Sequence, residues 1–177
     1  MKPTNAIDAD TRHLIDGAQF KMAMRHLAGA VSVITVGSWE ERSGFTATSV
    51  SSLSADVPSV IVCVNRTSSS WPILERRQRF CVNVLAQDQQ HIAQSFAGQN
   101  GRQGVARYAD ADWHELSTGT PALKDALTVL DCVLERAVHH HSHAILIGHV
   151  CAMTVRSGAR PLLYWQGGYQ HLKSTEA

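Results

Sequence analysis

The sequence predicts a mainly β fold with a few short helices, built as a single domain. Apolar, strand-like runs recur along most of the chain, and no regular alternation of strand, helix and strand accompanies them. The chain has 177 residues, 44% of them hydrophobic, which is enough for one substantial core. Antiparallel strands with three short helices indicate a closed barrel whose ends the helices cover. We expect residues 1–177 to form one domain, with residues 1–10 as a flexible tail.

The first half of the chain predicts one helix and three strands. Phe20, Met24 and Leu27 recur at helical spacing, and Gly29 supplies a stop signal. The strand-like runs that follow are AVSVITV from Ala30, FTATSV from Phe45 and SVIVCVN ending at Asn65. The polar turn SWEERSG makes the first two a predicted hairpin.

Two more short helices enclose the buried strand FCVNVLA. The segment SSSWPILERR has a serine before Trp71 as its expected cap and a proline in its first turn. The segment DQQHIAQSFAG has Asp88 as its expected cap and Gly98 after its end. Residues 99–120 lose the pattern and predict a long surface loop. The strands then resume as LTVLDCVLERAV, SHAILIGHVCAMTV and PLLYWQGGY.

Charge and composition exclude several classes of function. The formal net charge is +1 and the densest basic cluster is the short Glu75–Arg79 segment, so neither nucleic acid nor an anionic membrane is an expected partner. The N-terminus carries acidic residues where a signal peptide needs an apolar core, which predicts a cytoplasmic protein. The four cysteines are Cys63, Cys81, Cys132 and Cys151. Their isolation in apolar runs predicts four buried free thiols, without disulfides.

The stretch GFTATSVSS is rich in hydroxyl side chains and has no charge. Between Ser43 and Leu74 the only charged residues are Asp56 and Arg66. Alternation along the strand places the hydroxyls of Thr46 and Thr48 on one face, where they could bind the edge of a flat heterocycle. Ordinary β propensity and a serine-rich turn explain any one of these residues equally well.

A second polar segment, NRTSSSWP, joins the end of a strand to the start of a helix. Arg66 and three serines there would favour an anion, and phosphate is the usual one. Plain helix capping is the alternative, although capping needs only one serine.

The segment HHHSHAILIGH concentrates histidine. His139, His141, His143 and His149 share parity, but no HExxH motif or neighbouring carboxylate completes a metal site, so we expect no bound metal. We expect His139 to His141 to form an exposed hairpin turn, and one histidine beside the apolar strand to take part in chemistry.

Together these segments resemble a known family. The residues SGFTATSVSSLSADVPSVIVCVNRTSSSWPIL and FCVNVLAQDQQHIAQSFAG, the stretch from His143 to Val150 and the ending PLLYWQGGYQHL are similar to the short-chain flavin reductases of two-component flavin-dependent monooxygenases. The resemblance covers about Phe20 to Leu172. It implies the FMN-binding split β-barrel fold.

The resemblance also implies an activity and a set of site residues. It implies an NAD(P)H:flavin oxidoreductase, a homodimer that uses NADH or NADPH to reduce FMN or FAD for a separate oxygenase. The isoalloxazine and ribityl chain would meet Thr46, Ala47, Thr48, Ser49, Ser51 and Ser52; the phosphate end would meet Asn65, Ser68, Ser69 and Ser70; Phe96 and Ala97 would add flavin contacts. His143 matches the histidine that lies by the nicotinamide in the family.

The chain departs from the family pattern at two places. His141 and Ser142 stand where the family commonly has Gly and Asp, and Val57 stands where it has the first of two prolines. The first departure leaves open the choice between NADH and NADPH. The competing hypotheses are a non-catalytic or tightly flavin-bound split-barrel flavoprotein, and a histidine-rich metal-binding barrel.

Overall fold

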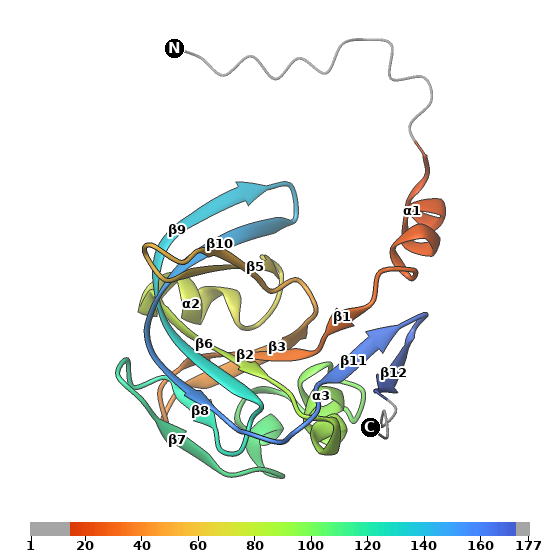
Figure 1. Cartoon of the computed structure of the whole chain (residues 1–177). Coiled ribbons are helices and arrows are strands. Elements are labelled where there is room, and N and C mark those ends of the chain that lie inside the picture. Colours follow the sequence, from red (N-terminus) through yellow and green to blue (C-terminus); the bar gives the residue numbers. More distant parts are fainter. Residues whose placement is uncertain (1–14, 173–177) are drawn as a thin grey trace, which may run out of the picture.

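The main structural element is a curved, seven-stranded antiparallel sheet (Figure 1). The computed structural model describes residues 15–172. In spatial order the strands of this sheet are β3 (Arg42–Ala47), β2 (Ser32–Gly37), β6 (Arg79–Val84), β9 (Thr128–His140), β10 (His143–Val155), β5 (Ser59–Asn65) and β4 (Ser51–Ser54). The long β9–β10 hairpin runs through the whole molecule. The mainly β expectation is confirmed.

The barrel is split rather than closed. Strands β3 and β4 are the two edges of the sheet and do not pair with each other, although only residues 48–50 separate them in the chain. The Ser49 hydroxyl contacts both the main-chain N (3.2 Å) and the main-chain O (3.4 Å) of Cys63. A side chain therefore replaces backbone pairing where the chain crosses from β3 towards β5. This corrects the closed barrel and agrees with the split barrel that the resemblance implies.

Two small sheets complete the fold. One contains β1 (Gly29–Ala30), β11 (Leu162–Trp165) and β12 (Gly168–His171), and it lies beside the first helix. The other contains β7 (Trp113–Glu115) and β8 (Pro121–Leu123). Strand β1 pairs only with β11, so the predicted run from Ala30 is divided between two sheets.

Every residue of β2 is buried, because β2 separates two hydrophobic clusters. Val33 packs into the cluster that contains Phe96 and Leu162, and Ile34 packs into the barrel interior with Phe80. This is why β2 does not alternate between buried and exposed residues; Ser32 and Thr35 interrupt its apolar residues and are themselves buried.

The four cysteines divide equally between the interior and the surface. Cys81 and Cys132 are buried, and burial raises the pKa of the Cys132 thiol to about 12. Cys63 and Cys151 are exposed, because alternation along β5 and β10 turns them to the outer face of the sheet. All four are free thiols, so the prediction was right about disulfides and wrong about two of the burials.

The first helix, α1 (Gly17–Met24), does not pack on the core. It starts with an Asp16 capping box and contains no buried residue. Phe20 is 53% exposed and Leu27, beyond the helix end, is 64% exposed. The helix ends at Met24, before the predicted stop at Gly29, and its apolar stripe faces a cleft described below. No helix among residues 15–172 is long and apolar enough to cross a membrane.

The other two helices are α2 (Trp71–Arg77) and α3 (Gln90–Phe96), and neither has its predicted cap. The Ser70 side chain does not cap α2; it is buried, with its hydroxyl 3.0 Å from the Ser43 hydroxyl. Asp88 lies in a 3-10 turn, η1 (Gln87–Gln89), and pairs with Arg156. Each of these two side chains binds a residue distant in the sequence instead of the backbone of the helix that it was expected to cap.

Residues 99–120 are not a plain surface loop. They include the 3-10 turn η2 (Gly104–Tyr108) and strand β7. Tyr108 is buried against Phe96 and Trp113, and its hydroxyl donates to the main-chain O of Ser43 (2.6 Å). This segment therefore braces β3, the strand that carries the predicted flavin residues.

Candidate functional site

Four of the predicted flavin residues line one small cleft. Its volume is about 210 Å³, and its walls are Val31, Thr46, Ala47, Thr48, Ala97, Tyr164 and Tyr169. The Thr46 hydroxyl donates to the main-chain O of Ala93 (2.7 Å), which ties the end of β3 to α3. The structure thus brings Ala97 to the strand that the sequence singled out, although the two are about fifty residues apart.

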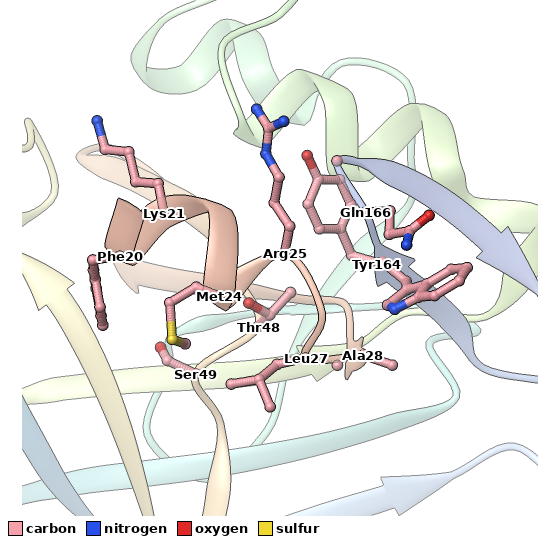
Figure 2. Close-up of a pocket in the computed structure, with 13 residues that line it drawn as sticks. Phe20, Lys21, Met24, Arg25, Leu27, Ala28, Thr48, Ser49, Tyr164 and Gln166 are labelled. Carbon is pink, nitrogen blue, oxygen red and sulfur yellow. The ribbon is translucent and has the colours of Figure 1, made fainter. Parts of the chain in front are cut away.

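A larger cleft of about 770 Å³ adjoins the small one (Figure 2). It lies between α1 and the β11–β12 hairpin, and it shares Thr48 and Tyr164 with the small cleft. Its lining includes Phe20, Lys21, Met24, Arg25, Leu27, Ser49, Trp165 and Gln166. The two clefts together form a continuous candidate site, with Thr48 and Tyr164 at its centre.

The sequence did not predict the α1 side of this site. The spacing of Phe20, Met24 and Leu27 predicted a helix, and PLLYWQGGY predicted a strand, but neither segment indicated that the two would line one cleft. Exposed apolar side chains beside Lys21 and Arg25 are typical of a binding cleft. The two aromatic residues Tyr164 and Tyr169, on opposite sides of the Gln166–Gly167 turn, were the available signal in the sequence.

Ser51 and Ser52 lie apart from both clefts. They are exposed on the edge strand β4, and Ser51 pairs with Ile61 of β5. Phe96 is also separate, because its ring is 2% exposed and packs beneath β3 with Tyr108. Ring contact between Phe96 and flavin stays a prediction; in the structure Phe96 supports the strand and Ala97.

The predicted phosphate residues gather between β5 and α2, but they are not equivalent. Asn65 accepts hydrogen bonds from the main chain and the hydroxyl of Thr67, both at 3.0 Å. Ser69 is exposed, with its hydroxyl 3.4 Å from the Ser43 hydroxyl, whereas Ser70 is buried, with its hydroxyl 3.0 Å from the same group. The Ser68 hydroxyl oxygen is buried and has no hydrogen-bond partner among the described residues. Of the three serines, Ser69 is therefore the most accessible to a ligand, and Ser68 has unused bonding capacity.

His143 is the first residue of β10, outside the two clefts. It pairs with Asn65 on one side and with His140 on the other, and its Nδ1 lies 2.9 Å from the Ser142 hydroxyl. Its backbone position is therefore fixed by two neighbouring strands. The register also places it at the same end of the sheet as Asn65, one of the predicted phosphate residues.

The histidine turn is shorter than predicted. Only His141 and Ser142 form the turn, while His139 and His140 belong to β9. His139 pairs with Ala144 and His140 pairs with His143, so the neighbouring histidines point to opposite faces of the hairpin. Within residues 15–172 no three His, Cys, Asp or Glu side chains converge as a metal site would require.

The chain is similar in sequence to a known protein family. Residues 24–173 match the model of the flavin reductase like domain. The chain belongs to this family. The flavin reductase-like chain is 38% identical over 159 residues to the FMN reductase (NADH) RutF of Klebsiella pneumoniae, covering 90% of this chain and 96% of that protein.

Solved structures of flavin reductases have the same fold. The NADH:FAD oxidoreductase SgcE6 of Streptomyces globisporus, in complex with NAD and FAD fragments, superposes with a TM-score of 0.83 at 26% identity, covering 93% of this chain and 99% of that one. BorF, the flavin reductase component of a bacterial two-component tryptophan halogenase, gives 0.81 at 29% identity, covering 90% and 99%.

The electrostatics of the site suit a ligand with a flat, uncharged ring and an anionic group. The small cleft is lined by no charged side chain, and burial beside Tyr164 raises the pKa of Tyr169, which stays a neutral hydroxyl at physiological pH. In the larger cleft the cations Lys21 and Arg25 are present without a carboxylate. In this flavin reductase-like protein the site can therefore position a ring and an anionic group, and it offers no strong acid or base.

Proposed function

We propose that this protein is a flavin reductase that oxidises NADH, reduces FMN and releases the reduced flavin to a separate oxygenase. The observation that carries the proposal is the uncharged cleft at Thr46, Ala47 and Thr48, closed by Ala97 and two tyrosines. FMN and NADH are chosen over FAD and NADPH because curated relatives of 38% identity are FMN reductases that use NADH. The use of NADH favours the cytoplasm as the place of action.

The residues present fit a flavin. Ala47 and Ala97 leave room for a flat ring, and the exposed hydroxyl of Thr48 beside them can bind a polar ring edge. A bound flavin would accept a hydride from NADH, and the residues of the cleft would hold the flavin ring in place for that transfer. The protein's contribution is orientation: the Thr46–Ala93 hydrogen bond fixes the strand, and hydroxyl and amide donors favour an electron-rich ring.

The test is whether catalysis depends on free flavin. Purified protein should oxidise NADH, followed at 340 nm, only when FMN is added, and the rate should saturate with FMN concentration. A stoichiometrically bound yellow flavin without NADH turnover would overturn the proposal in favour of a fixed-flavin protein. The same assay with FAD and NADPH measures both preferences.

The first prediction separates the two serines at the start of α2. Ser69→Ala should raise the KM for FMN with little change in kcat, because the phosphate is remote from the reacting ring and its contacts give uniform binding. Ser70→Ala should instead lower the free energy of unfolding by about 1 kcal/mol, because Ser70 bonds Ser43 in the interior. Steady-state kinetics and urea denaturation check both. An unchanged KM for FMN in the Ser69 variant would contradict the assignment.

The second prediction is that the protein is a homodimer joined through the outer face of the sheet. On that face Val138 and Ile145 lie directly opposite each other on β9 and β10, and they are 43% and 38% exposed. Cys63 continues the row on β5. A two-fold partner can cover such a row, which one chain leaves bare.

Light scattering at micromolar concentration should give twice the mass of one chain. Ile145→Asp should shift the protein to the monomer, while Val57→Asp, at an exposed turn, should leave the dimer intact. A parent protein with the mass of one chain would show the dimer to be wrong.

The third prediction concerns His143. His143→Ala should raise the KM for NADH by about 2- to 10-fold, the effect of losing one hydrogen bond, while the affinity for FMN is retained. His91→Ala, an exposed histidine on α3, serves as the control. Fluorescence quenching of FMN measures flavin affinity separately. A parent-like KM for NADH in the His143 variant would show that His143 does not take part in NADH binding.

A further inference from the structure

The larger cleft carries two positive charges that no protein group neutralises. Lys21 and Arg25 line it four residues apart, on α1 and its C-terminal cap, and this spacing places them on one helix face. In Figure 2 their charged ends extend in the same direction, and so does the Tyr164 hydroxyl. Within residues 15–172 neither cation has a hydrogen bond or an ion pair from its side chain. Two free cations on one wall favour an anionic ligand.

Negative charge is missing from both walls of this cleft. Residues 17–39 and 156–172, which contain α1 and the β11–β12 hairpin, include no Asp or Glu. The acid that precedes α1 is Asp16, and its carboxylate accepts from Ala18 N and Gln19 N at 2.8 Å each. Asp16 does not line the cleft. An anion bound there would therefore meet no carboxylate from the cleft walls.

The chain after α1 holds the cations close to the ring cleft. The main-chain O of Arg25 accepts from Gln166 N (2.9 Å) in the turn of the β11–β12 hairpin. Gly29 pairs with Tyr164, and a Cβ atom at Gly29 would lie only 3.1 Å from the Cβ of Thr48. The segment that follows α1 is thus packed against Thr48 and Tyr164, the two residues that the clefts share.

The predicted flavin phosphate site lies at the other end of β3. Ser43, near the start of β3, has its hydroxyl 3.4 Å from that of Ser69, whereas Thr48 follows the last residue of the strand. Five residues of extended chain, at about 3.3 Å each, separate Ser43 from Thr48. A flavin with its phosphate at Ser69 would direct its ring, and not its phosphate, towards Thr48. The adenylate of FAD is attached to that phosphate, so it would extend from the same end.

We propose that Lys21 and Arg25 bind the diphosphate of the nicotinamide dinucleotide, and that the cleft between α1 and the β11–β12 hairpin receives its adenosine half. This inference rests on the proposed flavin reductase function. Phe20 and Trp165, on the two walls, are 53% and 40% exposed and offer aromatic faces on which adenine can stack. Lys21 and Arg25 hold the dinucleotide in place and take no part in the hydride transfer itself.

The experiment measures NADH binding with and without the two cations. Dissociation constants come from the fluorescence of NADH, titrated without flavin, for the parent, Lys21→Gln/Arg25→Gln and the control Lys124→Gln, an exposed lysine outside this cleft. Each exposed charge contact should contribute about 2- to 5-fold, so the double variant should bind NADH about 10-fold more weakly at low salt. The difference should shrink at about 0.5 M salt, because exposed charges are screened.

Steady-state kinetics separate this role from a structural one. In the double variant the KM for NADH should rise while kcat and the KM for FMN stay at the parent values. With 1-benzyl-1,4-dihydronicotinamide, a hydride donor that has the same reacting ring and no phosphate, kcat/KM should be equal in all three proteins. An equal loss with this donor would indicate a structural role for the two cations and would overturn the proposal.

Two further results would also overturn it. A parent-like affinity of the double variant for NADH would show that the cations do not bind the dinucleotide. A raised KM for FMN with unchanged NADH binding would place the flavin phosphate at α1 instead. Failure of the parent to oxidise NADH when FMN is added would refute the proposed function, and this result is distinguishable because the NADH titration requires no turnover.

Discussion

Gly44→Ala should destabilise the protein by about 2 to 3 kcal/mol, the cost of overpacking a tight interior contact. Gly44 lies on β3, and a Cβ atom there would be 2.6 Å from Ile34 O and 2.7 Å from Cε1 of Phe96. The first contact is with backbone of the paired strand, which cannot rotate away. The second can be relieved only by moving Phe96, which sits under the strand that carries Thr46 and is followed by Ala97.

The variant should therefore lose flavin affinity as well as stability. A fall in Tm of roughly 4 to 12 °C is expected for a chain of this length, and FMN fluorescence quenching should show weaker binding. Gly17→Ala is the matched control, because a Cβ at Gly17 meets nothing within 4 Å. A parent-like Tm for Gly44→Ala would show that β3 and α3 can separate without cost.

Asp131→Ala should cost about 3 kcal/mol, because it removes a buried acceptor and leaves a cavity. Asp131 is fully buried on β9 and accepts from Thr118 N (2.7 Å), from the Thr118 hydroxyl (2.5 Å) and from the Cys81 thiol (3.1 Å). Burial, and then the Asp131 carboxylate, raise the pKa of the Cys81 thiol, so this thiol stays protonated and can donate. These bonds hold residues 118–120 against the sheet.

Asp131→Asn should recover part of the loss, because an amide oxygen can still accept from Thr118 N. Urea denaturation gives the free energies, and hydrogen exchange at residues 116–120 should accelerate in the alanine variant. Asp56→Ala, at an exposed turn, should match the parent. Equal stabilities for Asp131→Ala and the parent would mean that the loop is held by other contacts.

Much of the fold was predictable, because a strand is recognised from the apolar residues within its own short segment. The apolar runs that contain β2, β5 and β9 indicated strands, and the structure has strands there. The register of β9 with β10 was less predictable, because the turn has two residues rather than three histidines, and the pairing shifts between Ile147 and Gly148 and between Val150 and Ala152. Helix caps were less predictable. Ser70 and Asp88 are both residue types that commonly cap helices, but their side chains bind Ser43 and Arg156 instead.

The site was predictable in part, for the same reason. The hydroxyl-rich strand with Thr46 and Thr48 was visible as a segment without charge, and the structure confirms that it lines a cleft. The opposite wall of the larger cleft could not be predicted from the sequence. Phe20 and Trp165 have the same apolar character whether they line a core or a cleft. Only the folded chain distinguishes these two uses.

The sequence by itself determined most strands of the seven-stranded sheet, the uncharged segment with Thr46 and Thr48, and the resemblance to the family, because each is contained in short segments of the chain. Tertiary structure alone decided which cysteines are exposed, which of Ser68, Ser69 and Ser70 is available, and that His139 shares the Trp71 ring with Arg66. Those outcomes depend on which face of one strand meets another element, and sequence periodicity does not identify that element.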